Sequence, residues 1–273
     1  LIKRGVELTI IEIAPRIRPR MVDDEGAAIV QGWLEERGIK IMAGVEVTSI
    51  EDVSGGGKTV KLKSGADVDA DLVIMATGIK TNLEWLEGSG IEVNQGVLVN
   101  DHLRSSESNV YAAGDVAEGP DLLSDGKVVH AIEPTAMQHG RVVGANMAGV
   151  DTAFEGSLLM NIVDVLDLEI ASFGRWDDEE LEVVRVVKAD RPAYRKLLFE
   201  EGRLVGAILL GRTRDIWATN DVGMIKGLVQ SKCDLSEWKA HLKKNPFDIK
   251  RAYLAAGAAG NLIPQTLLGR PSV

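Results

Sequence analysis

The chain has 273 residues, 45% of them hydrophobic, which is enough for one large domain or for two to three smaller ones. The net charge of −10 disfavours a nucleic-acid partner, because phosphate binding depends on clustered Lys and Arg in excess. No run approaches the roughly 20 apolar residues of a membrane span, and no leader resembling a signal peptide is present. We therefore expect a soluble, cytoplasmic protein with no membrane or nucleic-acid partner.

Cysteine usage points the same way. Cys233 is the only cysteine, so neither an internal disulfide nor a thiolate metal cluster can form within this chain. Its neighbour Asp234 would not stabilise a thiolate, which favours a packing role over a redox role.

The first third of the chain has the pattern of a nucleotide-binding unit. The expected elements are a helix end over 1–5, a strand over 6–13, a helix from Asp23 or Asp24 to Arg37, and strands over 39–42, 45–51, 59–63 and 72–76. A glycine-rich hairpin over 54–58 joins the middle pair. We expect these strands to form most of one sheet.

Glu12 stands at the end of the first expected strand. In dinucleotide-binding units an acidic residue there binds the adenosine ribose, about 20 residues after a Gly-x-Gly-x-x-Gly turn. Counting back from Glu12 runs beyond residue 1, and the glycines at 55–57 and 88–90 lack the required spacing. Arg16, Arg18 and Arg20 either contact a nucleotide phosphate or form a solvated basic loop.

Two later apolar runs end in small residues. Residues 71–78 end in Ala-Thr-Gly, and residues 109–115 read Asn-Val-Tyr-Ala-Ala-Gly-Asp. At the end of a parallel strand, Gly allows a ligand to approach the main chain, and Asp accepts hydrogen bonds from sugar or ribityl hydroxyls. The same endings can also simply turn the chain. A helix opened by Pro134 follows and contains Gln138-x-Gly140-Arg141.

This ordered set resembles the flavin-dependent pyridine nucleotide disulfide oxidoreductases, in the branch of rubredoxin reductases, NADH oxidases and nitrite reductase flavin domains. The resemblance implies an α/β fold in which partial Rossmann-like FAD/NAD(P)-binding domains precede an α+β carboxyl-terminal interface domain with an antiparallel sheet. The implied domains are an NAD-binding domain over 1–79 that lacks its first strand and glycine turn, the second half of a FAD-binding domain over 80–152, and an interface domain over 153–273.

The resemblance also implies the cofactors FAD and NAD(H) and the residues that contact them. Glu12 would bind the adenosine ribose, Thr77 and Gly78 would flank the nicotinamide nucleotide, Gly114, Asp115 and Val116 would bind the ribityl or phosphate side of the flavin, and Pro134 and Thr135 would face the isoalloxazine. None of these is a proton-transfer catalyst, and no metal site is expected. Glu133 departs from the apolar residue usual there, and His130 and His139 are expected to be surface or core polar groups.

The last third has the pattern of an antiparallel sheet. Strands are expected over 168–173, 181–188, 194–200 and 203–210, with a tight hairpin at Glu201-Gly202 and helices over about 215–232 and 235–242 covering one face. The resemblance implies a homodimer formed through this domain. The His-Pro dipeptide of the disulfide-reducing members is absent from the sequence, which argues against glutathione reductase or lipoamide dehydrogenase chemistry.

The favoured function is part of a FAD-dependent NAD(P)H oxidoreductase that passes hydride from NADH to flavin and on to a redox protein, oxygen or a thiol acceptor. We expect that the amino-terminal half of such a protein is missing and that this chain alone is inactive. The alternative is a truncated, non-catalytic assembly module with relic nucleotide sites. A thiol-dependent oxidase or coenzyme A disulfide reductase would need a cysteine in the missing part.

Overall fold

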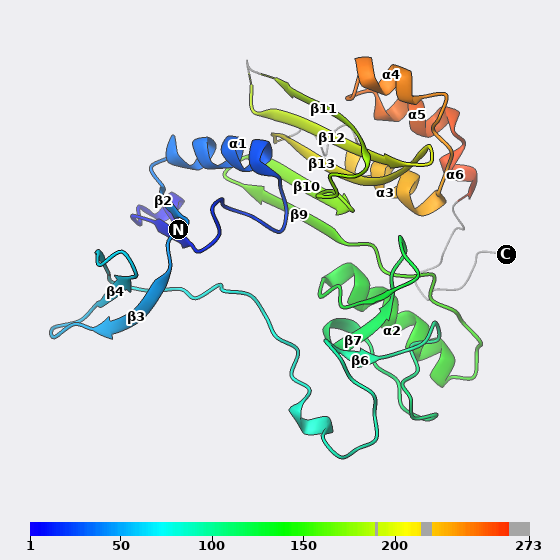
Figure 1. The fold of residues 1–273 in the computed structure, drawn as a ribbon, viewed down its shortest axis with the longest axis horizontal. Helices are drawn as coiled ribbons and strands as arrows, with labels where there is room; N and C mark the ends of the chain where they lie inside the picture. The colour runs from blue at the N-terminus through cyan, green and yellow to red at the C-terminus, as the bar shows by residue number, and fades with distance from the viewer. Residues whose placement is uncertain (189–190, 214–219, 262–273) are drawn as a thin grey trace.

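The computed structural model describes residues 1–188, 191–213 and 220–261. Its strands form four sheets, and the chain runs from an amino-terminal unit through an extended segment to a second unit and then to a large sheet (Figure 1). The helices are α1 (Asp24–Glu35), α2 (Glu133–Met147), α3 (Asp221–Ser231), α4 (Lys239–Lys244), α5 (Ile249–Ala255) and α6 (Ala258–Asn261). None of the helices in the described part is long and apolar enough to cross a membrane.

The amino-terminal unit is a strand-helix-strand arrangement. Strands β1 (Thr9–Glu12) and β2 (Lys40–Ala43) pair in parallel, with α1 between them in the chain. The side chain of Asp23 accepts a hydrogen bond of 3.1 Å from Gly26 N–H, which caps the first turn of α1. Gly38 adopts a left-handed φ of 81° after the helix. The predicted helix and its capping residue are confirmed, whereas the first strand is shorter than expected.

The next three strands form a sheet of their own. Strands β3 (Val47–Asp52), β4 (Lys58–Leu62) and β5 (Asp67–Ala70) pair in antiparallel fashion, and the glycine hairpin joins β3 to β4 as predicted. They do not extend the β1–β2 pair, so the expectation of one nucleotide-binding sheet is wrong for the described residues. The short, charged strand β5 was not predicted.

The strand expected over 72–76 is absent from the described structure. The segment runs extended between β5 and the short 3-10 turn η2 (Glu84–Leu86), drawn without an arrow in Figure 1. Leu72, Ile74 and Met75 are 73%, 63% and 71% exposed. A strand needs a neighbour to accept its backbone hydrogen bonds, and no described strand pairs with this one. The apolar character of residues 72–76 favoured a strand, but the described structure contains no partner strand for them.

The second unit contains short strands and the longest helix. Strands β6 (Val97–Leu98) and β7 (Ala117–Pro120) pair in parallel, and β7 pairs with β8 (Lys127–Val128). The sequence of residues 96–100 and of residues 110–113 also predicts a short strand in each segment. The first is reduced to β6, and the second forms only a single bridge between Tyr111 and Arg104. Buried Glu118 joins β7 to the turn before β6, because its carboxylate accepts hydrogen bonds from Asn94 Nδ2, Gln95 N–H and Gly96 N–H.

The carboxyl-terminal sheet is antiparallel throughout, in the order β11-β12-β13-β10-β9. Its strands are β9 (Met160–Val165), β10 (Leu168–Gly174), β11 (Glu182–Lys188), β12 (Ala193–Glu200) and β13 (Arg203–Arg212). The four predicted strands are confirmed within two residues, and β9 was missed. Glu201 and Gly202 both have positive φ, 47° and 82°, as a tight hairpin between twisted strands requires.

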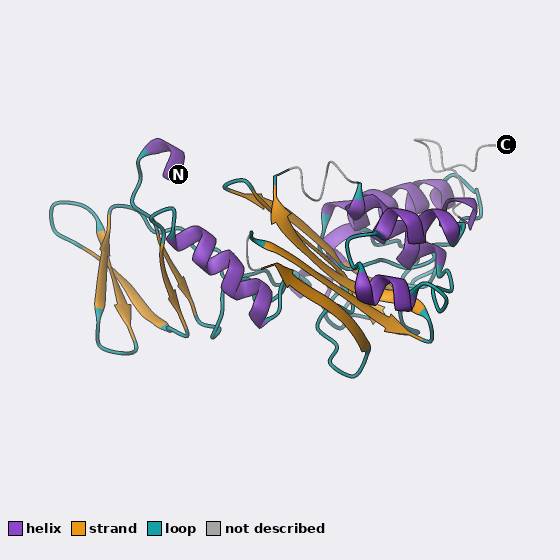
Figure 2. Cartoon of the chain, turned by 90° about the horizontal axis from the view of Figure 1, so that it is seen from above, coloured by secondary structure: helices purple, strands orange, loops and turns teal. Residues whose placement is uncertain are grey.

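Helices cover both faces of this sheet (Figure 2). On one face, the core includes Phe173, Leu197 and Leu209 from the sheet and Ile225 from α3. On the other face, Ile170, Leu198 and Ile208 pack against α1 of the amino-terminal unit. Cys233 is buried in the first core, as the packing interpretation predicted. The sheet therefore joins the two ends of the chain.

The predicted carboxyl-terminal helices are partly confirmed. The expected helix over 215–232 corresponds to α3, although residues 215–219 lie outside the described residues. The helix expected from Leu235 begins only at Lys239, as α4. Helices α5 and α6 were not predicted.

Candidate functional site

The Gly-Asp ending forms a tight turn against α2. Gly114 begins the 3-10 turn η3 (Gly114–Val116) with a left-handed φ of 74°. A Cβ atom added to Gly114 would lie 3.4 Å from the Cβ of Ala136 in α2. Glycine is favoured here because it adopts positive φ at little cost and lets the turn approach the helix closely.

The other two residues of this turn face different surroundings. Asp115 is exposed, so its carboxylate faces solvent. Val116 is half-buried and packs against the core formed by Val97, Val99 and Leu103. The turn is thus anchored by apolar contacts on one side and presents a carboxylate on the other.

The amino terminus of α2 lies beside this turn. Ile132 occupies the N-cap position, so no side chain caps the first turn of the helix. Pro134 is half-buried, Thr135 is 3% exposed, and Glu133 lies exposed at the first helical residue. A helix terminus without a side-chain cap can direct backbone N–H groups at a negatively charged ligand.

His139 is a core polar group, one of the two interpretations that the sequence allowed, but its contact with the Gly114 turn was not predicted. It is 2% exposed, and its Nδ1 accepts a hydrogen bond of 3.2 Å from Gly114 N–H. Burial, with a smaller effect from His130, lowers the pKa of His139 to about 4. In the sequence, His139 follows Thr135 by four residues, which places both on one face of α2. This spacing was the available indication that the two polar residues share a surrounding.

Glu12 lies at the end of β1, as the ribose-binding hypothesis requires. Its side chain is half-buried, and its Oε1 accepts a hydrogen bond of 2.9 Å from Ala14 N–H. Of the three arginines that follow, Arg16 binds within the protein: its Nη1 lies 2.9 Å from Asp24 Oδ1, and its Nε donates to Val22 O at 3.3 Å. Arg18 and Arg20 are exposed.

Thr77 and Gly78 lie exposed in the extended segment after β5. Gly78 has a φ of 103°, and a Cβ atom added to it would lie 4.0 Å from Arg20 Nη1. The structure therefore brings the predicted residues together in two groups. Gly78 lies beside the loop after β1, whereas Gly114 to Val116 lie beside the start of α2.

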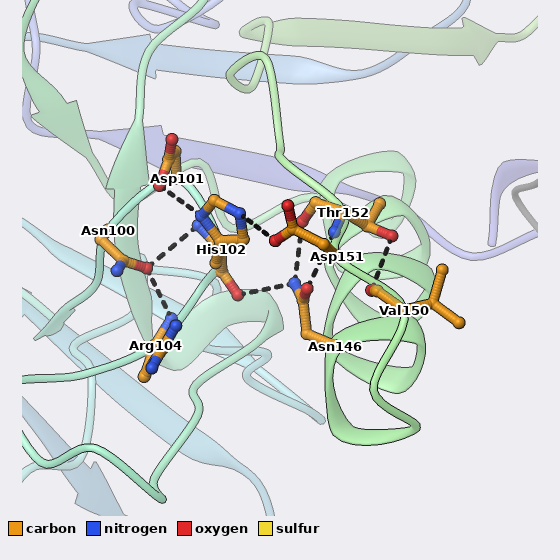
Figure 3. Close-up of polar contacts among 8 residues, drawn as sticks. All are labelled: Asn100, Asp101, His102, Arg104, Asn146, Val150, Asp151 and Thr152. Atoms are coloured by element: carbon orange, nitrogen blue, oxygen red, sulfur yellow. Dashed lines mark hydrogen bonds and ion pairs between the residues drawn. The ribbon is translucent and has the colours of Figure 1, made fainter.

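A polar cluster around His102 holds the second unit together at the far end of α2 (Figure 3). His102 Nδ1 lies 2.6 Å from Asp101 Oδ1, and His102 Nε2 lies 2.9 Å from Asp151 Oδ1. Asn146 donates to the backbone oxygens of His102 and Thr152 at 3.1 and 2.8 Å. Across the described ranges, no group of three or more His, Cys, Asp or Glu residues could hold a metal ion. The hydrogen bonds of Asn146 join α2 to the segments that contain His102 and Thr152.

Comparison with protein families identifies the chain. The family described as pyridine nucleotide-disulphide oxidoreductase matches residues 1–140. The chain belongs to this family. Residues 160–222 match the rubredoxin NAD+ reductase C-terminal domain. The predicted fold class is confirmed, since solved structures of FAD-dependent members of the family share the α/β architecture with a carboxyl-terminal antiparallel sheet.

Curated relatives and solved structures extend this result. The chain is 30% identical over 262 residues to the NADH-dependent phenylglyoxylate dehydrogenase subunit epsilon of Aromatoleum evansii, covering 93% of this chain and 60% of that protein. It is 30% identical over 213 residues to the assimilatory nitrate reductase electron transfer subunit of Bacillus subtilis, covering 77% of this chain and 27% of that protein. The NAD-dependent persulfide reductase from A. fulgidus aligns with a TM-score of 0.77 and 25% identity, over 96% of this chain and 52% of that one. The chain thus spans only part of each relative.

Proposed function

We propose that this chain is part of a FAD-dependent NAD(P)H oxidoreductase that passes hydride from NADH to flavin and electrons on to an acceptor. The family match and the NADH-dependent relatives support this reaction. The acceptor would be a redox protein, oxygen or a thiol compound. Relatives include a rubredoxin-NAD(+) reductase from Pseudomonas putida, an NADH oxidase from Methanocaldococcus jannaschii and a CoA-dependent NAD(P)H sulfur oxidoreductase from Pyrococcus furiosus.

The observation that carries the proposal is the geometry of the turn formed by Gly114 and Asp115. Gly114 lets the turn lie closely against α2, Asp115 exposes a carboxylate, and the adjoining terminus of α2 has no side-chain cap. A flavin dinucleotide needs these features together: an acceptor for ribityl hydroxyls and a positive dipole end near its electron-rich edge. The residues present therefore fit FAD.

Each residue would then have a defined part. When bound, FAD accepts hydride from the nicotinamide and releases electrons singly or in pairs. Asp115, with the backbone of Gly114 and Val116, would bind the ribityl or phosphate side. Pro134 and Thr135 would position the start of α2 at the isoalloxazine, where the helix dipole favours negative charge. Glu133 places a carboxylate at the same terminus. Its negative charge would repel the negative charge on the flavin that the helix dipole favours.

The nicotinamide nucleotide would bind across the first unit. Glu12 would accept a hydrogen bond from the adenosine ribose, and Thr77 and Gly78 would flank the nicotinamide end. Arg20 lies beside Gly78, so it is a candidate to bind a phosphate of the same nucleotide. These assignments follow the division into an NAD-binding domain over 1–79, part of a FAD-binding domain over 80–152 and an interface domain over 153–273.

Further polypeptide would complete both nucleotide sites. The exposed apolar residues Leu72, Ile74, Met75 and Ile79 would pair with strands of an amino-terminal half that also supplies the glycine-rich phosphate turns. The carboxyl-terminal sheet would form the interface of a homodimer in the cytoplasm. The relatives are longer than the part that this chain matches, which supports the presence of further polypeptide in the intact protein.

A visible absorption spectrum tests the proposal. The longer protein containing this chain should purify with a flavin band at about 450 nm, whereas the 273-residue chain alone should lose FAD on gel filtration. A longer protein that neither retains nor binds added FAD would contradict the proposal and favour a non-catalytic assembly module. Sequencing its amino-terminal part for a cysteine would separate thiol-dependent from thiol-independent members.

A further inference from the structure

His139 is buried on the face of α2 that lies against the Gly114 turn. Its ring is 2% exposed and makes an edge contact with Phe154, with ring centroids 4.6 Å apart at 87°. Thr135, one helical turn earlier, is also buried. A buried polar residue on a helix needs a reason, since desolvation of an imidazole costs free energy unless its nitrogens are hydrogen-bonded.

Only one of the two ring nitrogens of His139 is satisfied. Nδ1 accepts the hydrogen bond from Gly114 N–H at 3.2 Å, so the neutral ring carries its proton on Nε2. Nε2 is buried and has no hydrogen-bond partner among the residues that the structure describes. The lowered pKa keeps the ring neutral at physiological pH, which preserves Nδ1 as an acceptor. Among the described residues, the imidazole thus leaves one buried nitrogen without a hydrogen bond and uses the other to accept from Gly114.

Gly114 is the residue where that contact matters. Its left-handed φ of 74° sets the direction in which Asp115 leaves the turn. Glycine has access to many other backbone conformations, so its own preference does not hold the turn in this one. The hydrogen bond to His139 restricts the peptide between Ala113 and Gly114 and fixes it against α2.

We propose that His139 is a positioning residue that holds the Gly114–Asp115 turn in the conformation that receives FAD. The identity of the ligand, FAD, rests on the proposed function. The role of His139 in holding the turn does not depend on it. His139 does not touch the reacting atoms; it acts through the backbone of Gly114. Its effect is to preorganise the turn, so that binding does not have to order the backbone at that point.

Three substitutions separate the hydrogen bond from the packing. In His139→Asn, Oδ1 can occupy the place of Nδ1 and accept from Gly114 N–H. In His139→Gln, the polar atoms lie one bond further out and correspond to Nε2 instead. His139→Leu fills the site without any acceptor and also removes the unsatisfied Nε2–H, so the variant should stay folded.

The first measurement is amide hydrogen exchange at Gly114 in the 273-residue chain. Exchange should accelerate about tenfold or more in His139→Leu and His139→Gln, and return towards the wild-type rate in His139→Asn. The amide of Ala136, which bonds to Ile132 O in the same helix, is the internal control and should not change. Unchanged exchange at Gly114 in His139→Leu would overturn the inference, whatever the flavin does.

The second measurement is the dissociation constant for FAD in the longer protein. It should rise about tenfold in His139→Leu and His139→Gln and return towards wild type in His139→Asn. Equal FAD affinity in wild type and His139→Leu, despite faster exchange at Gly114, would overturn the link between His139 and the flavin. If even wild type binds no FAD, the proposed function fails, while the exchange result still supports the hydrogen bond that holds the turn.

Discussion

The hydroxyl of Tyr194 donates a hydrogen bond of 2.7 Å to Oδ2 of Asp23, 171 residues earlier in the chain. The same carboxylate caps α1 through Gly26 N–H and lies 3.0 Å from Lys196 Nζ. Asp23 therefore attaches the helix of the first unit to strand β12 of the carboxyl-terminal sheet. This contact ties the proposed nicotinamide-binding unit to the rest of the molecule.

Replacement of Asp23 should destabilise the chain measurably. Asp23→Ala removes a helix cap and leaves Tyr194 and Lys196 without this partner, so the free energy of unfolding should fall by about 2–3 kcal/mol. Asp23→Asn retains a good capping side chain and should cost about 1 kcal/mol. Urea denaturation compares the two, and an Asp23→Asn variant as stable as wild type would show that the contact with β12 contributes nothing beyond the cap.

The Asp23 carboxyl should also make the stability of the chain depend on pH in the acid range. Burial would raise its pKa, but hydrogen bonds from Tyr194, Gly26 N–H and Lys196 outweigh burial and lower it. A lowered folded-state pKa contributes stability above the unfolded-state value of about 3.9, and this is lost as pH falls through the folded-state pKa. The stability difference between wild type and Asp23→Asn should therefore shrink in acid; a constant difference would contradict the assignment.

The contribution of His102 to stability should change with pH in the opposite direction. The hydrogen bond to Asp101, with Asp151 also contributing, raises the pKa of His102. Its contribution to stability is complete below the unfolded-state pKa of about 6.5 and is lost as pH rises through the folded-state pKa. His102→Gln should thus lower the thermal midpoint more at about pH 5.5 than at about pH 8.5. Equal effects at both values would show that the charge of His102 is not involved.

Asp115→Ala should weaken FAD binding more than it affects folding. A charge-assisted hydrogen bond is worth about 1.5–3 kcal/mol, which corresponds to an increase of roughly 10- to 150-fold in the dissociation constant of the longer protein for FAD. Asp125→Ala, which removes another exposed carboxylate of the same unit, is the matched control. If Asp115→Ala retains FAD through dilution as well as the control does, Asp115 does not contact the flavin.

NADH should be preferred over NADPH by the longer protein. Glu12 would hydrogen-bond a ribose 2′-hydroxyl and repel a 2′-phosphate. Arg16 is engaged by Asp24, so Arg18 and Arg20 are the arginines that could favour NADPH. kcat/KM should be higher with NADH, and Glu12→Ala should reduce this preference. A higher kcat/KM with NADPH in wild type would show that an arginine overrides the carboxylate.

The sequence was most informative where structure depends on local signals. The cap at Asp23, the glycine ending of α1 and the Glu201-Gly202 hairpin were all predicted, because each depends on a few neighbouring residues. The four strands of the last third were predicted because each is a strand-like run bounded by Gly, Asp or Pro turns. Because β10, β12 and β13 are buried on both faces, alternation between buried and exposed residues was not the signal.

Prediction failed where structure depends on distant partners. Residues 72–76 have a strand-like sequence, but whether they form a strand depends on a neighbour that periodicity cannot reveal. The bond between His139 and Gly114 spans 25 residues and follows from the placement of α2 against η3. The packing of α1 on the carboxyl-terminal sheet likewise joins segments that no local pattern connects.

Anaerobic addition of NADH to the flavin-loaded longer protein tests the central claim most directly. We expect this chain to supply the ribose-binding carboxylate and the flavin-binding turn of one oxidoreductase. One equivalent of NADH should then bleach the flavin absorbance at about 450 nm. Asp115→Ala should release the flavin, so this absorbance should be lost from the protein. A protein that holds FAD but shows no loss of this absorbance with excess NADH or NADPH would contradict the account.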